Sequence, residues 1–269
     1  MRSGSKAALN RACERWEGYL LTRAGDEMAL AREVFTVMDV LRNSAVLSNA
    51  LEDGARSPDD RAALAHDVLS GRVNDEVTEL VMGLARDQWS QNGDLRLALE
   101  HLGVHAILVG ARREGMLGTV EEELYQSSRL LKDQRELRLA FTSVNQPLEL
   151  RQNLATQIFA SASPYTVELI KRAIAHGEKT IASALRSYLR ATAQMADHLV
   201  ASVTSAIPLT TEQEARLGRI LSAKYGKDVH IHVTIDTSVI GGVRVHVDDD
   251  VIDGTIASRL KAVREVFTH

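Results

Sequence analysis

The 269-residue chain is 45% hydrophobic and 25% charged, an ordinary globular composition with length for two or three domains. Its net charge of −4 lacks the basic excess of nucleic-acid-binding proteins, so we expect no nucleic-acid partner. The single cysteine excludes an intrachain disulfide, and no apolar run reaches the roughly 18 residues of a membrane helix, so membrane association is expected only through partners.

Helical periodicity dominates residues 1 to about 200. Apolar residues recur there every three or four positions, which places them on one face of a helix. The low proline content and the abundance of Ala, Leu, Glu and Arg also favour helices. The clearest stripes are Leu9, Ala12, Trp16 and Tyr19; Leu30, Val34, Met38 and Leu41; and Val77, Leu80, Val81 and Leu84.

Five residues mark expected helix ends. Ser57 is a predicted N-cap, and Pro58 suits the first helical position. Asp94 is the predicted cap of the next long helix. Farther along, Thr210 opens a capping-box pattern, and Gly226 stands where a helix-ending glycine belongs.

The helical part contains an internal repeat. Residues 41–65 match residues 131–155 without a gap, and the order and spacing of several helices indicate a duplicated helical bundle. We expect the long helix around 95–113 to close the first bundle and open the second. The identities pair Leu41, Leu47, Ala50, Arg61, Leu64 and Ala65 with Leu131, Leu137, Ala140, Arg151, Leu154 and Ala155.

The periodicity changes near residue 200. Residues 201–207, 229–235 and 243–247 alternate apolar and polar positions, which predicts strands with one buried face. A helix is expected between the first two, Val251–Ile252 can pair back on the third, and a last helix with Ile256, Leu260 and Val263 follows. The predicted fold is mainly α: two helical bundles followed by a small β-α-β-β-α domain.

Two short motifs in the last domain have competing interpretations. Gly241-Gly242 lies between two alternating strands, which favours a tight turn or a close backbone approach over a phosphate-binding loop, because such a loop would open a helix. Asp248-Asp249-Asp250 lacks the spacing of a calcium loop, so a solvated turn is favoured over a metal site.

Three histidines are the most enzyme-like group in the sequence. His230 and His232 share one face of a strand, and His246 on a neighbouring strand could lie close, as in a zinc site with an open position. A polar sheet face opposite the Val/Ile face is the favoured alternative. Cys13 is interpreted as a buried or half-buried structural residue. No catalytic, metal or cofactor residues are therefore predicted.

The C-terminal motifs resemble the ATP synthase delta subunit family, whose mitochondrial counterpart is the oligomycin-sensitivity-conferring protein. Several motifs in fixed order over about 60 residues make the resemblance specific. Residues 1–97 depart from an ordinary family member and resemble the extra bundle copy of actinobacterial forms. The matching segments are 105–115, 120–124 and 136–141 in the helical part, and 203–209, 235–236, 240–245 and 251–260 after it.

This resemblance implies three domains: the extra helical copy (1–97), a delta-type helical bundle (98–200) and a stalk-binding α/β domain (201–269). It implies a non-catalytic stator subunit on the cytoplasmic face of the cell membrane. Such a subunit binds N-terminal helices of the α subunits of the catalytic head and the C-terminus of a b-type stalk, and it holds the head still against rotor torque. A helical scaffold unrelated to ATP synthase is the alternative, and a metal enzyme using the three histidines is a third possibility.

The partner-binding residues are predicted from these expected surfaces. For an α-subunit helix we expect a groove between the first and last helices of the second bundle, although the same residues would also suit its core. For the stalk we expect the C-terminal sheet and the last helix to form the contact, with partly exposed side chains on that helix. The predicted residues are Leu102, Ala106, Val109, Leu185, Leu189 and Ala193 for the groove, and Ile256, Leu260 and Val263 for the stalk.

Overall fold

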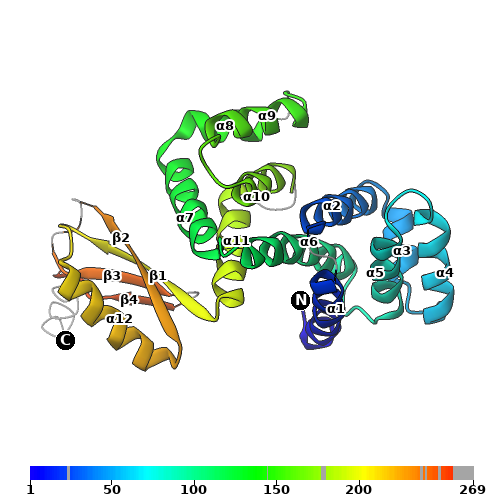
Figure 1. Cartoon of the computed structure of the whole chain (residues 1–269), viewed down its shortest axis with the longest axis horizontal. Coiled ribbons are helices and arrows are strands. Elements are labelled where there is room, and N and C mark those ends of the chain that lie inside the picture. Colours follow the sequence, from blue (N-terminus) through cyan, green and yellow to red (C-terminus); the bar gives the residue numbers. More distant parts are fainter. Residues whose placement is uncertain are drawn as a thin grey trace, which may run out of the picture. The chain divides into compact units, whose positions relative to one another are not determined.

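The computed structural model describes residues 1–22, 25–143, 145–176, 180–236, 239, 241–247 and 250–256. Within these residues the chain forms twelve helices and one four-stranded sheet, so the predicted mainly α fold with a small α/β part is confirmed (Figure 1). The chain divides into two compact units, Met1–Leu185 and Arg186–His269, and each is described by itself. None of the described helices is both long and apolar enough to cross a lipid bilayer.

The first unit is entirely helical in its described residues. Its helices follow one another through short connections, as is usual for antiparallel neighbours in bundles. They are α1 (Ser3–Thr22), α2 (Glu27–Asn43), α3 (Ala45–Glu52), α4 (Pro58–Leu69), α5 (Asp75–Arg86), α6 (Asp94–Arg113), α7 (Leu117–Asp133), α8 (Arg135–Thr142), α9 (Leu148–Ile158), α10 (Pro164–Ala175) and the beginning of α11 (Ile181–Met195).

Helix lengths confirm the predicted duplication. α2 and α7 have 17 residues each, α3 and α8 have 8 each, and α5 and α10 have 12 each. α1 and α6, which open the two copies, both have 20 residues. We refer to α1–α6 as the first repeat and to α6–α11 as the second repeat.

Helix α6 belongs to both repeats, as the sequence indicated. It is continuous from Asp94 to Arg113, and residues on nearly all of its faces are buried. It contacts α1 and α2 of the first repeat as well as α7 and α10 of the second. Figure 1 shows α1 and α2 on opposite sides of α6. The two repeats therefore share a structural element and are not joined by a linker.

Most predicted helix ends are confirmed. The Ser57 hydroxyl accepts a hydrogen bond from the amide of Asp60 at 3.1 Å, with Pro58 at the first helical position. Thr210 forms a complete capping box, and Gly226 ends the same helix with a φ of 70°. These ends depend on side chains within three or four residues of the helix, so the local sequence was enough to find them.

The predicted capping role of Asp94 is wrong. Gly93, with a φ of 93°, is the residue at the N-cap of α6. The Glu52 carboxylate, from the end of α3, accepts hydrogen bonds from the amides of Gly93 (2.9 Å) and Leu95 (2.8 Å). The Asp94 carboxylate instead accepts a 2.6 Å hydrogen bond from the Ser5 hydroxyl of α1. A buried acid from a neighbouring helix thus satisfies amides that a local cap would otherwise bind.

The second unit contains the rest of α11 and a mixed sheet covered by one helix. Its elements are β1 (His198–Ser205), α12 (Thr211–Tyr225), β2 (Asp228–Ile235), β3 (Val243–Val247) and β4 (Asp250–Asp253), and the strand order is β2-β1-β3-β4. β1 and β2 are parallel, which requires the crossover that α12 supplies, and the other pairs are antiparallel. This confirms the predicted β-α-β-β order; the final helix falls mainly on residues outside the described part.

One face of this sheet forms the core of the second unit. Ala201 and Val203 of β1, with Val245 of β3, are almost completely buried there, and Leu221 of α12 packs on them. Val251 and Ile252 pair back on β3, as expected. Ile207, which the alternation placed at the end of the first strand, lies beyond β1 and is 69% exposed.

Candidate interaction surfaces

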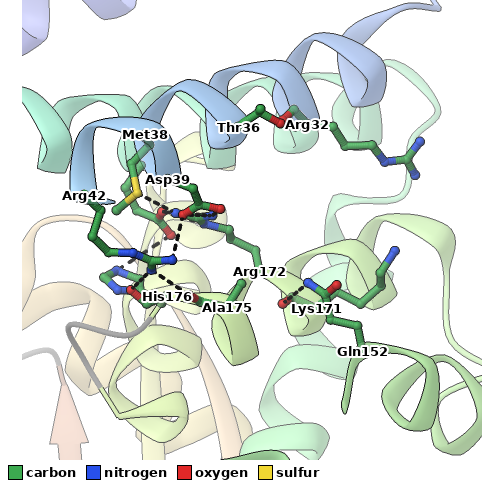
Figure 2. A network of polar contacts seen from close by, with 11 residues as sticks. Arg32, Thr36, Met38, Asp39, Arg42, Gln152, Lys171, Arg172, Ala175 and His176 are labelled. Atoms are coloured by element: carbon green, nitrogen blue, oxygen red, sulfur yellow. Dashed lines mark hydrogen bonds and ion pairs between the residues drawn. The ribbon is translucent and has the colours of Figure 1, made fainter. Parts of the chain in front are cut away.

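An extensive polar network in the first unit joins α2 to α10 beside the shared helix α6. We call it the α2–α10 junction, and Figure 2 shows its central part. It brings together residues far apart in the sequence along three helices, so it joins the first repeat to the second. Its charged residues are Glu27, Arg32, Asp39 and Arg42 of α2, Glu100 and Arg113 of α6, and Glu168 and Arg172 of α10.

Arg172 lies at the centre of the junction. Its Nε donates to Glu100 Oε2 at 2.7 Å, and its Nη1 donates to both Asp39 carboxylate oxygens at 3.1 Å. Nη2 approaches the Met38 sulfur at 2.8 Å, and the guanidinium carbon lies 4.5 Å from the centre of the Phe35 ring. The side chain is 3% exposed, so this buried cation is balanced by one acid of α2 and one of the shared helix α6.

Two further arginines of α2 reach α10 on either side of this centre. Arg42 Nη1 donates to the carbonyl oxygens of Ala175 (2.7 Å) and His176 (2.8 Å), at the C-terminus of α10, where a cation interacts favourably with the helix dipole. Arg32 forms a two-bond pair with the Glu168 carboxylate, each bond 3.0 Å long. Burial works to raise the pKa of Glu168, but the Arg32 hydrogen bonds and Lys171 outweigh it, so that pKa is lowered.

The opposite end of the junction joins the start of α2 to the end of α6. Arg113 Nε donates to the Glu27 carboxylate at 2.8 Å. Burial works to raise the pKa of Glu27, but the Arg113 and backbone hydrogen bonds outweigh it and hold that pKa below its usual 4.5. Tyr165 of α10 is buried nearby, and burial together with the Glu114 carboxylate raises its pKa to about 12.

Two glycines let the three helices approach closely. A Cβ added at Gly103 of α6 would lie 2.3 Å from the Phe35 ring, and one at Gly110 would lie 3.0 Å from the Tyr165 ring. α6 therefore needs glycine where α2 and α10 pack against it. The junction was not predicted from the sequence. The available signal was Glu100, an acidic residue that follows Leu99 in the middle of the long helix and occupies a position on its apolar stripe.

The residues predicted to line a groove are mostly buried. Leu102, Ala106 and Val109 of α6 are at most 2% exposed, and Trp16 Nε1 of α1 donates to the Leu102 carbonyl at 3.2 Å. On α11, Leu185 is completely buried, Leu189 is partly buried and Ala193 is 3% exposed. This burial also suits residues of a bundle core, and their binding role remains a prediction.

One predicted stalk-binding residue lies in the described chain. Ile256 is 46% exposed, and its amide donates to the Gly241 carbonyl at 3.0 Å. Leu260 and Val263 lie outside the described residues. The exposure of Ile256 leaves it available for a contact, as the prediction requires.

The Gly241-Gly242 motif is a close backbone approach, as the sequence favoured. Gly242 has a φ of 81°, and a Cβ there would lie 2.4 Å from the Gly254 carbonyl oxygen. The Gly254 amide donates to the Val243 carbonyl at 2.9 Å, and Asp253 accepts from the Thr255 amide. Of the aspartate run, Asp248 and Asp249 lie outside the described residues, and Asp250 begins β4.

The three histidines lie on the sheet face opposite the core. His232 of β2 and His246 of β3 are both in register with Ser202 of β1, which stands between them. Strands two apart in a sheet are separated by about 9.5 Å, which is wide for a shared zinc ion. In the part of the chain that the structure describes, no three His, Cys, Asp or Glu side chains form a metal-binding group.

Cys13 has the properties of a structural residue. It is half-buried on α1, and burial, with added repulsion from Glu17 and Glu14, raises the pKa of its thiol to about 11. A cysteine nucleophile needs the opposite shift, because the thiolate is the reactive form.

Comparison with known proteins finds relatives along the whole chain. The family model described as ATP synthase delta (OSCP) subunit matches residues 104–267. A protein of Beutenbergia cavernae named ATP synthase subunit delta is 38% identical over 266 residues, which are 98% of each chain. One with the same name from Streptomyces griseus is 36% identical over 263 residues, 97% of each chain. A chain in the Toxoplasma gondii mitochondrial ATP synthase hexamer is 18% identical, with a TM-score of 0.40, and the match covers 62% of this chain and 95% of that chain.

Proposed function

Because this chain belongs to the ATP synthase delta (OSCP) subunit family and so to the machinery of ATP synthesis, we propose that it is a non-catalytic stator subunit. In this role it connects the catalytic head to a b-type peripheral stalk and keeps the head from turning with the rotor. The observation that carries the proposal is the similarity to delta subunits over 98% of both chains, first repeat included.

The proposed partners follow from the two kinds of fold in the chain. Helical repeats can bind N-terminal helices of the α subunits by helix-in-groove contacts, and the α/β domain, with Ile256 exposed, can hold the end of the stalk. Two such contacts on one chain raise the effective concentration of each partner for the other. Membrane attachment, at the cytoplasmic face, would then come from the partner subunits.

The experiment is affinity purification of the tagged full chain from membranes of its own organism. The proposal requires that F-type ATPase α, β and b-type subunits co-purify in stoichiometric amounts. It also requires that removing the chain lowers proton-driven ATP synthesis while ATP hydrolysis by the detached head persists. A chain that purifies without any ATPase subunit would overturn the proposal in favour of an unrelated scaffold.

A substitution and its control test the proposed stalk contact. Ile256→Asp is expected to weaken binding of a peptide from the stalk C-terminus at least about tenfold, because it places a charge in an apolar contact. The exposed Ile220→Asp on α12 is the matched control and should leave that affinity within about twofold, since it lies outside the proposed contact. Equal effects of both substitutions would remove Ile256 from the stalk contact.

A further inference from the structure

We propose that the α2–α10 junction couples the two helical repeats into one rigid body, and that Arg172 is the residue that couples them. The coupling is a property of the isolated chain; its use in resisting torque rests on the proposed function. The extra repeat would then be a stiff extension of the subunit and not an independently moving appendage.

The shared helix alone would be a single connection between the repeats. A lone helix can bend and twist, and the repeats on its two sides would follow. The junction adds a second connection alongside it. Arg32–Glu168, Asp39–Arg172 and the bonds of Arg42 to the end of α10 are spread along both helices. Two parallel connections resist bending and twisting that one connection would allow.

Arg172 makes separation of the repeats costly. Undocking α2 would take Asp39, Met38 and the Phe35 ring away from the guanidinium, while Glu100 would stay beside it. Glu100 is itself 6% exposed and belongs to the shared helix. A buried cation that loses part of its partners is strongly disfavoured, so the docked arrangement is selected over open ones.

The internal repeat sets Arg172 apart from an arginine that each bundle needs for itself. The segment Glu79-Leu80-Val81 of α5 corresponds to Glu168-Leu169-Ile170 of α10, so Gly83 is the counterpart of Arg172. An arginine needed inside every bundle occurs in both copies, as Arg61 and Arg151 do. Arg172 has no arginine counterpart in the first repeat, and it lies on the helix of the second repeat that contacts α2. This distribution is expected for a residue that couples the repeats.

Both tryptophans of the chain provide a probe of the first repeat. Trp16 is on α1 and Trp89 precedes α6, so intrinsic fluorescence in denaturant reports the first repeat. Amide exchange of α8–α10 under the same conditions reports the second. For the native chain we expect both probes to give the same midpoint, because coupled repeats open together.

The test is Arg172→Met in the full chain. We expect the two midpoints to separate and exchange of α2 and α10 in buffer to become about tenfold faster, because these helices can then part without global unfolding. Arg11→Met is the matched control: it removes an ion pair with Asp87 within the first repeat, whose arginine is 55% exposed, and should leave the midpoints together.

The double variant Glu100→Gln with Arg172→Met distinguishes coupling from stability. It removes the buried acid together with the arginine, so most of the stability lost in Arg172→Met should return while the midpoints stay apart. It also provides the test should Arg172→Met not fold. Coincident midpoints in the double variant would overturn the coupling proposal, whether or not the chain co-purifies with ATPase subunits. Conversely, failed co-purification with coincident native midpoints would overturn only the stator role.

Discussion

The two helical repeats contain the same helices but bury them to different depths. In the first repeat, α3 buries Leu51 and α4 buries Ala62, Ala65 and Leu69. In the second repeat, Phe141 and Ala155 are the only buried residues of α8 and α9. A repeated sequence pattern can therefore reproduce the order and length of helices without reproducing how deeply they are buried.

Two further differences between the repeats accompany this difference in burial. Glu52, at the end of α3, is tied to the start of α6, and Thr142 stands at the corresponding place in α8 with its hydroxyl bonded only within its own helix. In addition, Leu139 and Leu150 are each 55% exposed, where the first repeat has Asn49 and Asp60. The first repeat is thus closed by a long-range polar contact for which the second has no counterpart at Thr142.

The largest expected loss of stability comes from breaking the contact between Glu52 and the start of α6. Glu52→Ala should cost about 3 kcal/mol of unfolding free energy, because buried amides at the start of α6 lose a charged acceptor. Thr142→Ala should cost less than about 0.5 kcal/mol. Urea denaturation of both variants, followed by helical circular dichroism, measures the difference. Equal costs would show that the acid does not close the first repeat.

The arginines common to both repeats sharpen the comparison. Arg61 is 2% exposed and donates to the Arg86 carbonyl at 3.3 Å, whereas the partly buried Arg151 donates to the Phe141 carbonyl at 3.1 Å. We expect Arg61→Met to cost about 2 kcal/mol and Arg151→Met about 1 kcal/mol, since Arg61 is the more deeply buried of the two. Denaturation midpoints check this order, and the reverse order would contradict it.

Acid should weaken the joint between the repeats. The pKa of Glu168 is lowered on folding from 4.5, so the stabilisation that this residue provides is present above about pH 4.5 and is lost as pH falls below it. Arg32 is half-exposed, which limits the Glu168 contribution to about 1 kcal/mol or less. The variant Glu168→Gln should therefore lose less melting temperature than the native chain between pH 6 and about pH 3.5.

Unchanged pH dependence in Glu168→Gln would contradict this assignment. Glu33→Gln is a suitable control, because Glu33 lies on α2 and its carboxylate accepts from the Asn74 amide within the first repeat. It should leave the loss of melting temperature between pH 6 and about pH 3.5 as in the native chain.

The smallest effect is expected from making the second repeat resemble the first on its surface. Leu139→Asn and Leu150→Asp introduce the first-repeat residues at half-exposed positions, and each should change stability by less than about 0.5 kcal/mol. Thermal unfolding of the double variant measures the sum. A loss well above about 1 kcal/mol would mean that these leucines pack more tightly than their exposure indicates.

Local features of the fold could be predicted from the sequence. Ser57, Thr210 and Gly226 end helices through contacts within three or four residues, so their roles were evident without a structure. The duplication was visible because insertions do not disturb the spacing of residues 41–65 and 131–155. The strands after residue 200 followed from a period of two, which the backbone geometry of a strand imposes.

The candidate site was predicted less well, for a physical reason. Leu102, Ala106 and Val109 have the same helical spacing whether they line a groove or fill a core. Only the structure shows that all three side chains are buried. The prediction for Ile256 depended on how exposed its side chain is, and the residues that surround it in the folded chain determine that exposure.

The sequence by itself determined which segments are helices or strands, where several of them end, and that one bundle is repeated, because these properties arise from periodicity and nearby side chains. Only the tertiary structure decided which charges meet. Arg172 finds Glu100 from 72 positions away and Asp39 from 133, and Glu52 replaces Asp94 as the cap of α6. Such contacts depend on where whole helices pack, since burial makes pairing of these charges necessary but does not specify the partner.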